Sequence, residues 1–130
     1  MSDFTRKYED GVTRCKWPGN DAQYIEYHDQ EWGVPRFGDD EMFERISLEG
    51  FQAGLSWITI LKRREGFRKA FKKFEVKKVA KLTEVDIEKL MQNEGIIRNR
   101  AKIVSTIKNA NLVLALQKQG ESISDIVWSF

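Results

Sequence analysis

Residues 90–103 read LMQNEGIIRNRAKI, an apolar helical pattern that stops at Gly95 and starts again a few residues later. A glycine permits the sharp turn between two helices, and the second helix exposes backbone N–H groups at its start. Arg98, Arg100 and Lys102 add positive charge beside those donors. The stretch therefore predicts a helix, a tight turn and a helix that can hold a phosphate, although ordinary helical bundles contain the same pattern.

Helical periodicity continues on both sides of this hairpin. No segment shows the sustained alternation of a strand, so we predict an all-α fold with many short helices. Residues 1–12 are polar and unpatterned and are expected to be a flexible extension. Residues 13–130 are expected to form one helical domain, with the hairpin at about 83–118. The expected helices cover 21–31, 40–53 (capped by Asp39), 57–64 (capped by Ser56), 84–93 (capped by Thr83) and 98–119, with short helical turns over 67–82 and a last helix from about 122.

The chain has 130 residues and a net charge of +2, but its charge is unevenly distributed. Residues 62–81 hold ten basic and two acidic side chains, so this basic window is +8 and the rest of the chain is −6. Such a window is either a solvated helical face or a surface that attracts a polyanion. The single cysteine excludes an internal disulfide, and the longest apolar run, Leu112–Leu116, is too short to span a membrane. We expect a cytoplasmic protein without a secretory signal or a membrane partner.

Glu49 shares a helical face with Met42, Ile46 and Ala53, because these positions follow the spacing of three and four residues. An unpaired carboxylate on an apolar stripe is costly, so Glu49 needs a partner or a ligand. It is either a structural glutamate bonded to backbone or arginine, or an acceptor aimed at a ligand amine.

Aromatic residues surround Glu49 in the sequence, and Tyr24, Tyr27 and His28 fall within one helical turn. Aromatic rings with one acidic acceptor suit a flat, electron-poor ring, although each ring taken singly is more often part of a core. The aromatic candidates are Trp17, Tyr24, Tyr27, Trp32 and Trp57.

Several stretches resemble, in order and in register, the motifs of the DNA-3-methyladenine glycosylase I family. The resemblance extends from about Arg14 to Phe130, and its two longest stretches are highly specific. The matching segments are RCKW (14–17), YIEYHDQEWGVP (24–35), LEGFQAGLSWITIL (48–61) and GIIR (95–98).

This resemblance implies a helix-hairpin-helix glycosylase that excises 3-methyladenine from double-stranded DNA after flipping the base out. It implies a base pocket of Glu49, Tyr27 and Trp57, with Trp17 and Tyr24 near its rim. The DNA backbone would be held by the hairpin residues Gly95, Ile96, Ile97, Arg98, Arg100 and Lys102. The free base would be the product, and we expect a monomer.

Members of this family hold a structural zinc with a Cys and a His near the start and a His and a Cys near the end. Cys15 and His28 match the first pair, and the chain contains one cysteine and one histidine in total. We therefore expect a C-terminally truncated member without the zinc-binding segment. Zinc is expected in the full-length protein and not in this chain alone.

Two other functions remain open at the level of sequence. The first is a catalytically silent module that binds DNA through the hairpin and the basic window. The second is a helical interaction module whose basic face meets an acidic protein, which leaves the combination of Glu49, Tyr27 and Trp57 unexplained.

Overall fold

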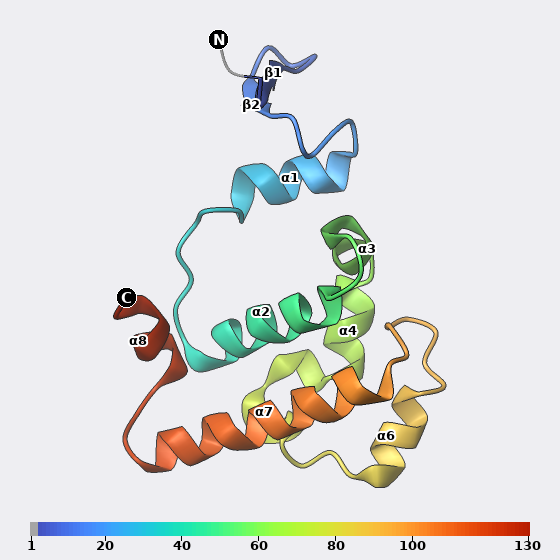
Figure 1. The fold of residues 1–130 in the computed structure, drawn as a ribbon, viewed down its shortest axis with the longest axis vertical. Coiled ribbons are helices and arrows are strands. Elements are labelled where there is room, and N and C mark those ends of the chain that lie inside the picture. The colour runs from blue at the N-terminus through green and yellow to red at the C-terminus, as the bar shows by residue number, and fades with distance from the viewer. Residues whose placement is uncertain (1–2) are drawn as a thin grey trace. The chain divides into compact units, whose positions relative to one another are not determined.

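The computed structural model describes residues 3–130, which divide into two compact units, Met1–Pro35 and Arg36–Phe130. Each unit is described by itself. None of the helices in the described residues is both long and apolar enough to cross a bilayer. The elements, most of which are labelled in Figure 1, are β1 (Thr5–Lys7), β2 (Thr13–Cys15), α1 (Ala22–Gln30), α2 (Asp39–Gln52), α3 (Trp57–Lys62), α4 (Arg64–Ala70), the 3₁₀ turn η1 (Lys72–Phe74), α5 (Val76–Val79), α6 (Glu84–Leu90), α7 (Arg100–Lys118) and α8 (Ile123–Trp128).

The first unit consists of a small β-hairpin followed by α1. Strands β1 and β2 pair antiparallel, with Arg6 opposite Arg14. Thr5–Lys7 thus lies in a strand, whereas the sequence predicted a flexible extension over 1–12. The pairing was not evident because three-residue strands are too short to show alternation. Helix α1 matches its predicted range and is capped by Asp21, whose side chain accepts from the Tyr24 N–H.

The second unit is helical, as predicted, and its core is built around phenylalanine. Helix α7 packs against α2 and α6, both labelled in Figure 1, and against α5. Its buried positions, which include Ile103, Ile107 and Ala110, recur every three or four residues along one face. Five phenylalanine side chains are almost completely buried beside them: Phe43, Phe51, Phe67, Phe71 and Phe74.

Helix α2 buries a different face from the one that the sequence predicted. Of the expected stripe only Met42 is buried, whereas Ile46, Glu49 and Ala53 are exposed. The buried face instead carries Phe43, Ser47, Leu48 and Phe51. Both stripes have helical spacing, but the second removes more apolar area from water because it contains two phenylalanines and a leucine.

Asp39 links the two ends of the second unit. It was predicted to cap α2, but Gly38 occupies that position and Asp39 is the first helical residue. Its carboxylate accepts hydrogen bonds from the Ser122 hydroxyl at 2.7 Å and the Ser124 N–H at 3.0 Å. Burial opposes the charged form, yet these bonds and one from Gln117 outweigh it and lower the pKa of Asp39. Asp39 therefore stabilises the start of α8 as an anion.

The predicted caps of the two other helices have mixed outcomes. Thr83 caps α6 in a reciprocal capping box with Asp86, as expected from its position. Ser56 stands before α3, but its side chain makes no cap bond and contacts the Thr59 hydroxyl at 2.8 Å instead.

Candidate functional site

The predicted hairpin is present and consists of α6, the connection 91–99 and α7. Asn99 caps α7, and its side chain accepts from the Lys102 N–H at 3.1 Å. The backbone N–H groups of Ile97 and Arg98 donate to no group within residues 3–130. The Arg98 side chain is exposed and makes no ion pair with any described residue. The connection therefore presents free backbone donors beside one free guanidinium, a combination that suits a phosphate.

The other predicted DNA-backbone residues are engaged within the protein. Arg100 pairs with Glu88 of the preceding helix. The Lys102 ammonium donates to the carbonyl oxygens of Phe51 and Ala53. Ile96 is buried, so its side chain anchors the connection to the core. Of the three predicted cations, the structure thus leaves only Arg98 unengaged.

Gly95 does not use the conformational freedom expected of it, since its backbone lies outside the left-handed region. Close packing between the connection and α4 instead requires a glycine at position 66. A Cβ atom on Gly66 would lie 2.3 Å from the Gly95 carbonyl oxygen. Arg63 adds a hydrogen bond of 2.9 Å from its guanidinium to the Glu94 carbonyl oxygen. Sequence reasoning missed Gly66 and Arg63. A glycine inside a helical segment was the available signal for Gly66, because it costs stability unless packing requires it.

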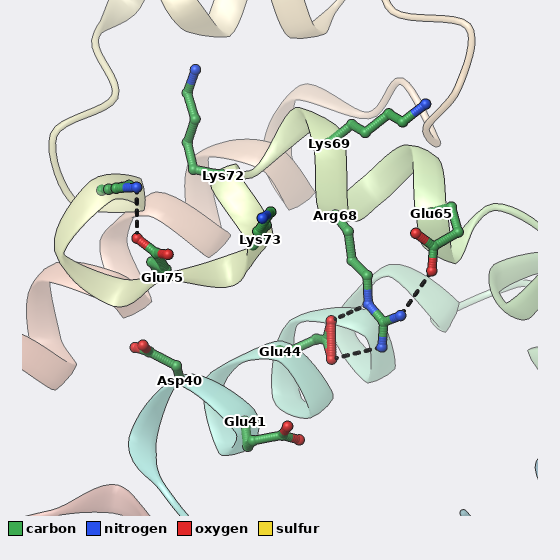
Figure 2. A pocket seen from close by; sticks show the side chains of 10 residues that line it. Asp40, Glu41, Glu44, Glu65, Arg68, Lys69, Lys72, Lys73 and Glu75 are labelled. Atoms are coloured by element: carbon green, nitrogen blue, oxygen red, sulfur yellow. Dashed lines mark hydrogen bonds and ion pairs between the residues drawn. The ribbon is translucent and has the colours of Figure 1, made fainter.

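The basic window forms one wall of a groove of about 720 Å³ between the start of α2 and the segment α4–α5 (Figure 2). Arg68 pairs with Glu44 at 2.6 Å and with Glu65 at 2.8 Å. The Glu44 carboxylate is the largest influence on Arg68 and raises the pKa of its guanidinium. Lys78 pairs with Glu75, whereas Lys69 and Lys72 extend away from the carboxylates. The window is thus a mixed surface in which some cations are structural and some remain free.

Trp17 is the centre of an aromatic cluster in the first unit. Its ring lies 5.0 Å from that of Tyr24 and 6.3 Å from that of Tyr27, in edge-to-face geometry. Trp17 also contacts His28 and Trp32, which stack on each other. The predicted rim residues and Tyr27 are therefore brought together. Burial raises the pKa of Tyr24, because desolvation disfavours the charged form of its hydroxyl.

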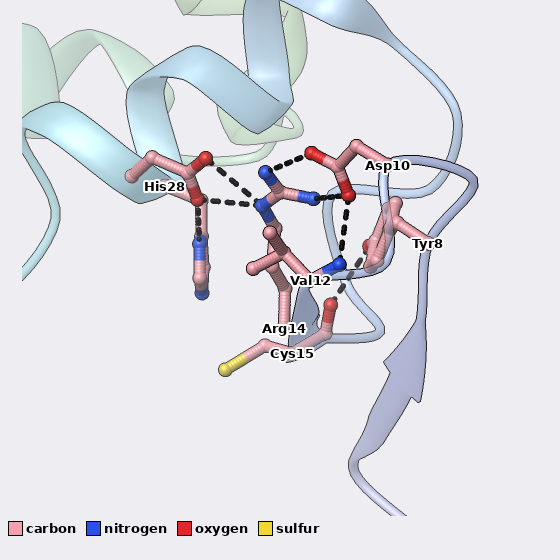
Figure 3. A network of polar contacts seen from close by, with 7 residues as sticks. Tyr8, Asp10, Val12, Arg14, Cys15 and His28 are labelled. Carbon is pink, nitrogen blue, oxygen red and sulfur yellow. Dashed lines mark hydrogen bonds and ion pairs between the residues drawn. The ribbon is translucent and has the colours of Figure 1, made fainter.

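Arg14 holds this unit together through a polar network (Figure 3). Its guanidinium donates to Asp10 and Asp29 and lies over the Tyr8 ring. Asp29 also bonds the Nδ1 atom of His28 at 2.8 Å. This bond to His28 is the largest influence on Asp29 and lowers the pKa of its carboxylate. The network fixes the ring of His28, a role for Arg14 that sequence reasoning had not assigned.

Cys15 and His28 both belong to the first unit, where the cysteine is a free thiol. Among the described residues, no cluster of three or more His, Cys, Asp and Glu side chains is placed to hold a metal. Cys15 and His28 could supply at most two of the four ligands of a tetrahedral zinc site, so the residues of this chain do not fit a complete one.

Glu49 and Trp57 belong to the second unit, near the end of α2 and at the start of α3. Glu49 is exposed, so the argument that a buried charge requires a partner does not apply to it. Trp57 is half-buried and packs against the phenylalanine core. Gly54, with a φ of +82°, reverses the chain between these two residues.

A helical unit whose hairpin offers free backbone donors places the chain in the helix-hairpin-helix class. The sequence profile of one such group, the methyladenine glycosylases, matches residues 17–130. The chain belongs to the methyladenine glycosylase family.

Individual relatives agree with this assignment. The chain is 56% identical over 119 residues to the DNA-3-methyladenine glycosylase of Haemophilus influenzae, covering 92% of this chain and 64% of that protein. The crystal structure of a 3-methyladenine DNA glycosylase I superposes with a TM-score of 0.87 at 52% identity, covering 89% of this chain and 64% of that one. The enzyme from Staphylococcus aureus, whose structure was described for its recognition of 3-methyladenine, gives 0.84 at 37% identity, with coverages of 88% and 61%. The chain thus spans less than two thirds of the length of these relatives.

Proposed function

We propose that this protein is a DNA glycosylase that removes 3-methyladenine from double-stranded DNA. The observation that carries the proposal is its family membership over residues 17–130, supported by the free donors of the hairpin. The hairpin would hold a phosphate through the Ile97 and Arg98 N–H groups and the Arg98 guanidinium. An enzyme that acts on a base in a duplex must first extrude it, and the grip on the backbone supports that step.

The base-binding residues that we propose are Glu49 and Trp57 in the second unit and, in the first unit, Tyr27, Trp17 and Tyr24. Methylation at N3 makes adenine cationic, and a cation over an aromatic face gains about 0.5–2 kcal/mol. Glu49 would accept a hydrogen bond from the exocyclic amine, which contributes about 1.5–3 kcal/mol when one partner is charged. Its exposure in the second unit leaves this carboxylate accessible to a ligand.

The chemistry requires little acid catalysis, because departure of the base neutralises its positive charge. Water would attack C1′ of the sugar as the bond to N9 breaks. We assign no general base, and Glu49 is proposed to act in binding and not in proton transfer.

Release of 3-methyladenine from methylated DNA tests this function. The assay is run on the 130-residue chain and on a version extended at its C-terminus to the length of the relatives. Release by either protein supports the proposal. DNA binding without release by both would favour the alternative, a catalytically silent DNA-binding module.

The role of Glu49 has a separate test. Glu49→Gln should weaken the binding of free 3-methyladenine by about tenfold or more, equivalent to at least 1.4 kcal/mol. Isothermal calorimetry measures this affinity, and Glu41→Gln, an exposed carboxylate earlier on the same helix, is the matched control. Equal affinity in Glu49→Gln and the unmodified chain would remove Glu49 from the pocket.

We further propose that the protein acts as a monomer in the cytoplasm and that this chain alone holds no stoichiometric zinc. Light scattering measures the mass in solution, and a dimer would contradict the first point. Metal analysis of the purified chain measures zinc, and one full equivalent per chain would contradict the second.

A further inference from the structure

Lys102 stands at the start of α7 but is directed toward the end of α2. Its ammonium donates to the Ala53 carbonyl oxygen at 2.6 Å and to the Phe51 carbonyl oxygen at 2.9 Å. These partners lie 49 and 51 residues away in the sequence. The side chain therefore joins the second helix of the hairpin to a segment that is remote along the chain.

The end of α2 needs this ammonium, because the last carbonyl groups of a helix have no intrahelical partner. The turn after α2 satisfies two of them, since the Ala53 N–H donates to Gly50 and the Leu55 N–H donates to Gln52. The carbonyl oxygens of Phe51 and Ala53 are the ones that Lys102 takes. A cation at this position also complements the negative end of the helix dipole.

The segment capped by Lys102 connects two proposed base-binding residues. Glu49 lies two residues before Phe51 and four before Ala53, and Trp57 follows them after the reversal at Gly54. We infer that Lys102 is a positioning residue that sets the geometry of the segment 51–57, and so couples the hairpin's grip on DNA to base recognition. Its meaning for catalysis rests on the proposed function.

This role differs from that of a phosphate contact, and Arg98 provides the comparison. Arg98 is exposed and pairs with no residue in the described range 3–130, whereas the ammonium of Lys102 is already bonded to two carbonyl oxygens. Neutralising a residue that contacts a phosphate lowers the slope of log K against log salt by about 0.9. Neutralising Lys102 should leave that slope unchanged.

The test compares K102M, K102R and R98M in the 130-residue chain. DNA affinity is measured by fluorescence anisotropy over a range of salt concentrations. The indole N–H resonance of Trp57, assigned with W57F, is followed by NMR. We expect K102M to keep the salt slope and to shift the Trp57 resonance. K102R should keep that resonance at its position in the unmodified chain. R98M should lower the salt slope without shifting the Trp57 resonance. In a protein that releases the base, K102M should reduce turnover by about tenfold, because misplacement of substrate-contacting groups costs rate.

Two results would overturn the inference. A salt slope reduced in K102M as much as in R98M would make Lys102 a phosphate contact. An unmoved Trp57 resonance in K102M would remove its positioning role. If K102M does not fold, K102Q, which keeps a donor, is measured in the same way. Neither readout requires glycosylase activity, so absence of base release would count against the proposed function and not against this inference.

Discussion

The hairpin and the basic window are both rich in arginine and lysine, but they present their charges differently. The window holds ten cations, and some of its lysines, such as Lys69 and Lys72, make no ion pair with a described residue. Among the described residues, the hairpin connection presents a single unpaired cation, Arg98, and two backbone N–H groups, those of Ile97 and Arg98, that make no hydrogen bond there. Backbone donors cost no side-chain entropy when they bind, whereas each lysine must be ordered. We therefore expect the proposed contact with DNA at the hairpin connection and not at the segment with the most cations.

The largest effect on DNA binding is expected from Gly66→Ala. The added methyl group would meet the Gly95 carbonyl oxygen at 2.3 Å and must displace the connection from α4. We expect a loss of stability of about 1–3 kcal/mol, as in other overpacked sites. DNA affinity should fall by about tenfold, or 1.4 kcal/mol.

Urea denaturation and fluorescence anisotropy measure the two effects of Gly66→Ala. The matched control is Gly50→Ala in α2, where an added Cβ meets no atom within 4 Å. Gly50→Ala should leave the free energy of unfolding unchanged or raise it by up to about 1 kcal/mol. Equal stability of the two variants would show that the close contact between α4 and the connection does not require a glycine at position 66.

Arg98→Met is expected to have the next largest effect. Loss of one phosphate contact should lower the salt slope by about 0.9 and weaken binding severalfold at moderate salt. The same titration on Arg100→Met provides the control, because Arg100 is paired with Glu88. A larger loss in Arg100→Met than in Arg98→Met would contradict the assignment of the free cation.

A double variant of the basic window, Lys72→Met with Lys73→Met, should have a small effect. Both side chains are exposed, and both line the groove between the start of α2 and the segment α4–α5. We expect the salt slope to change by less than about 0.4, below the value for half a contact. A decrease of nearly two would mean that the window, and not the hairpin, is the main contact with DNA.

Arg68→Met should not affect DNA binding and should lower stability only modestly. Arg68 bridges Glu44 and Glu65, and 33% of its side chain is exposed. Partial exposure to water limits the value of this pair, so we expect a loss of about 1 kcal/mol in thermal or urea denaturation. Weaker DNA binding at unchanged stability would place Arg68 in the interface.

The elements of the fold were largely predictable from local signals. Thr83 marked the start of α6, and the glycine turn marked the hairpin. The buried face of α2 was not predictable, because two stripes of the same helix had suitable spacing and only the packing of Phe43 and Phe51 decides between them. The pairing of β1 with β2 was missed because it depends on contacts between very short segments.

The candidate site was predictable in its residue types but not in its engagements. Three cations near Gly95 suggested three phosphate contacts, yet Arg100 and Lys102 have partners that lie 12 and 49–51 residues away. Such distant partners leave no periodic signal in one sequence. Glu49 appeared to be a buried charge for a related reason. Packing against distant segments decides which face of α2 is buried, and Glu49 lies on the exposed face.

The central claim is that the hairpin connection holds the DNA backbone. Titration of the ¹⁵N-labelled chain with a short duplex, followed by amide chemical shifts, tests it most directly. The largest shifts are expected at Ile97, Arg98 and the first residues of α7. Shifts concentrated over residues 69–81, with the amides of Ile97 and Arg98 unchanged, would contradict it.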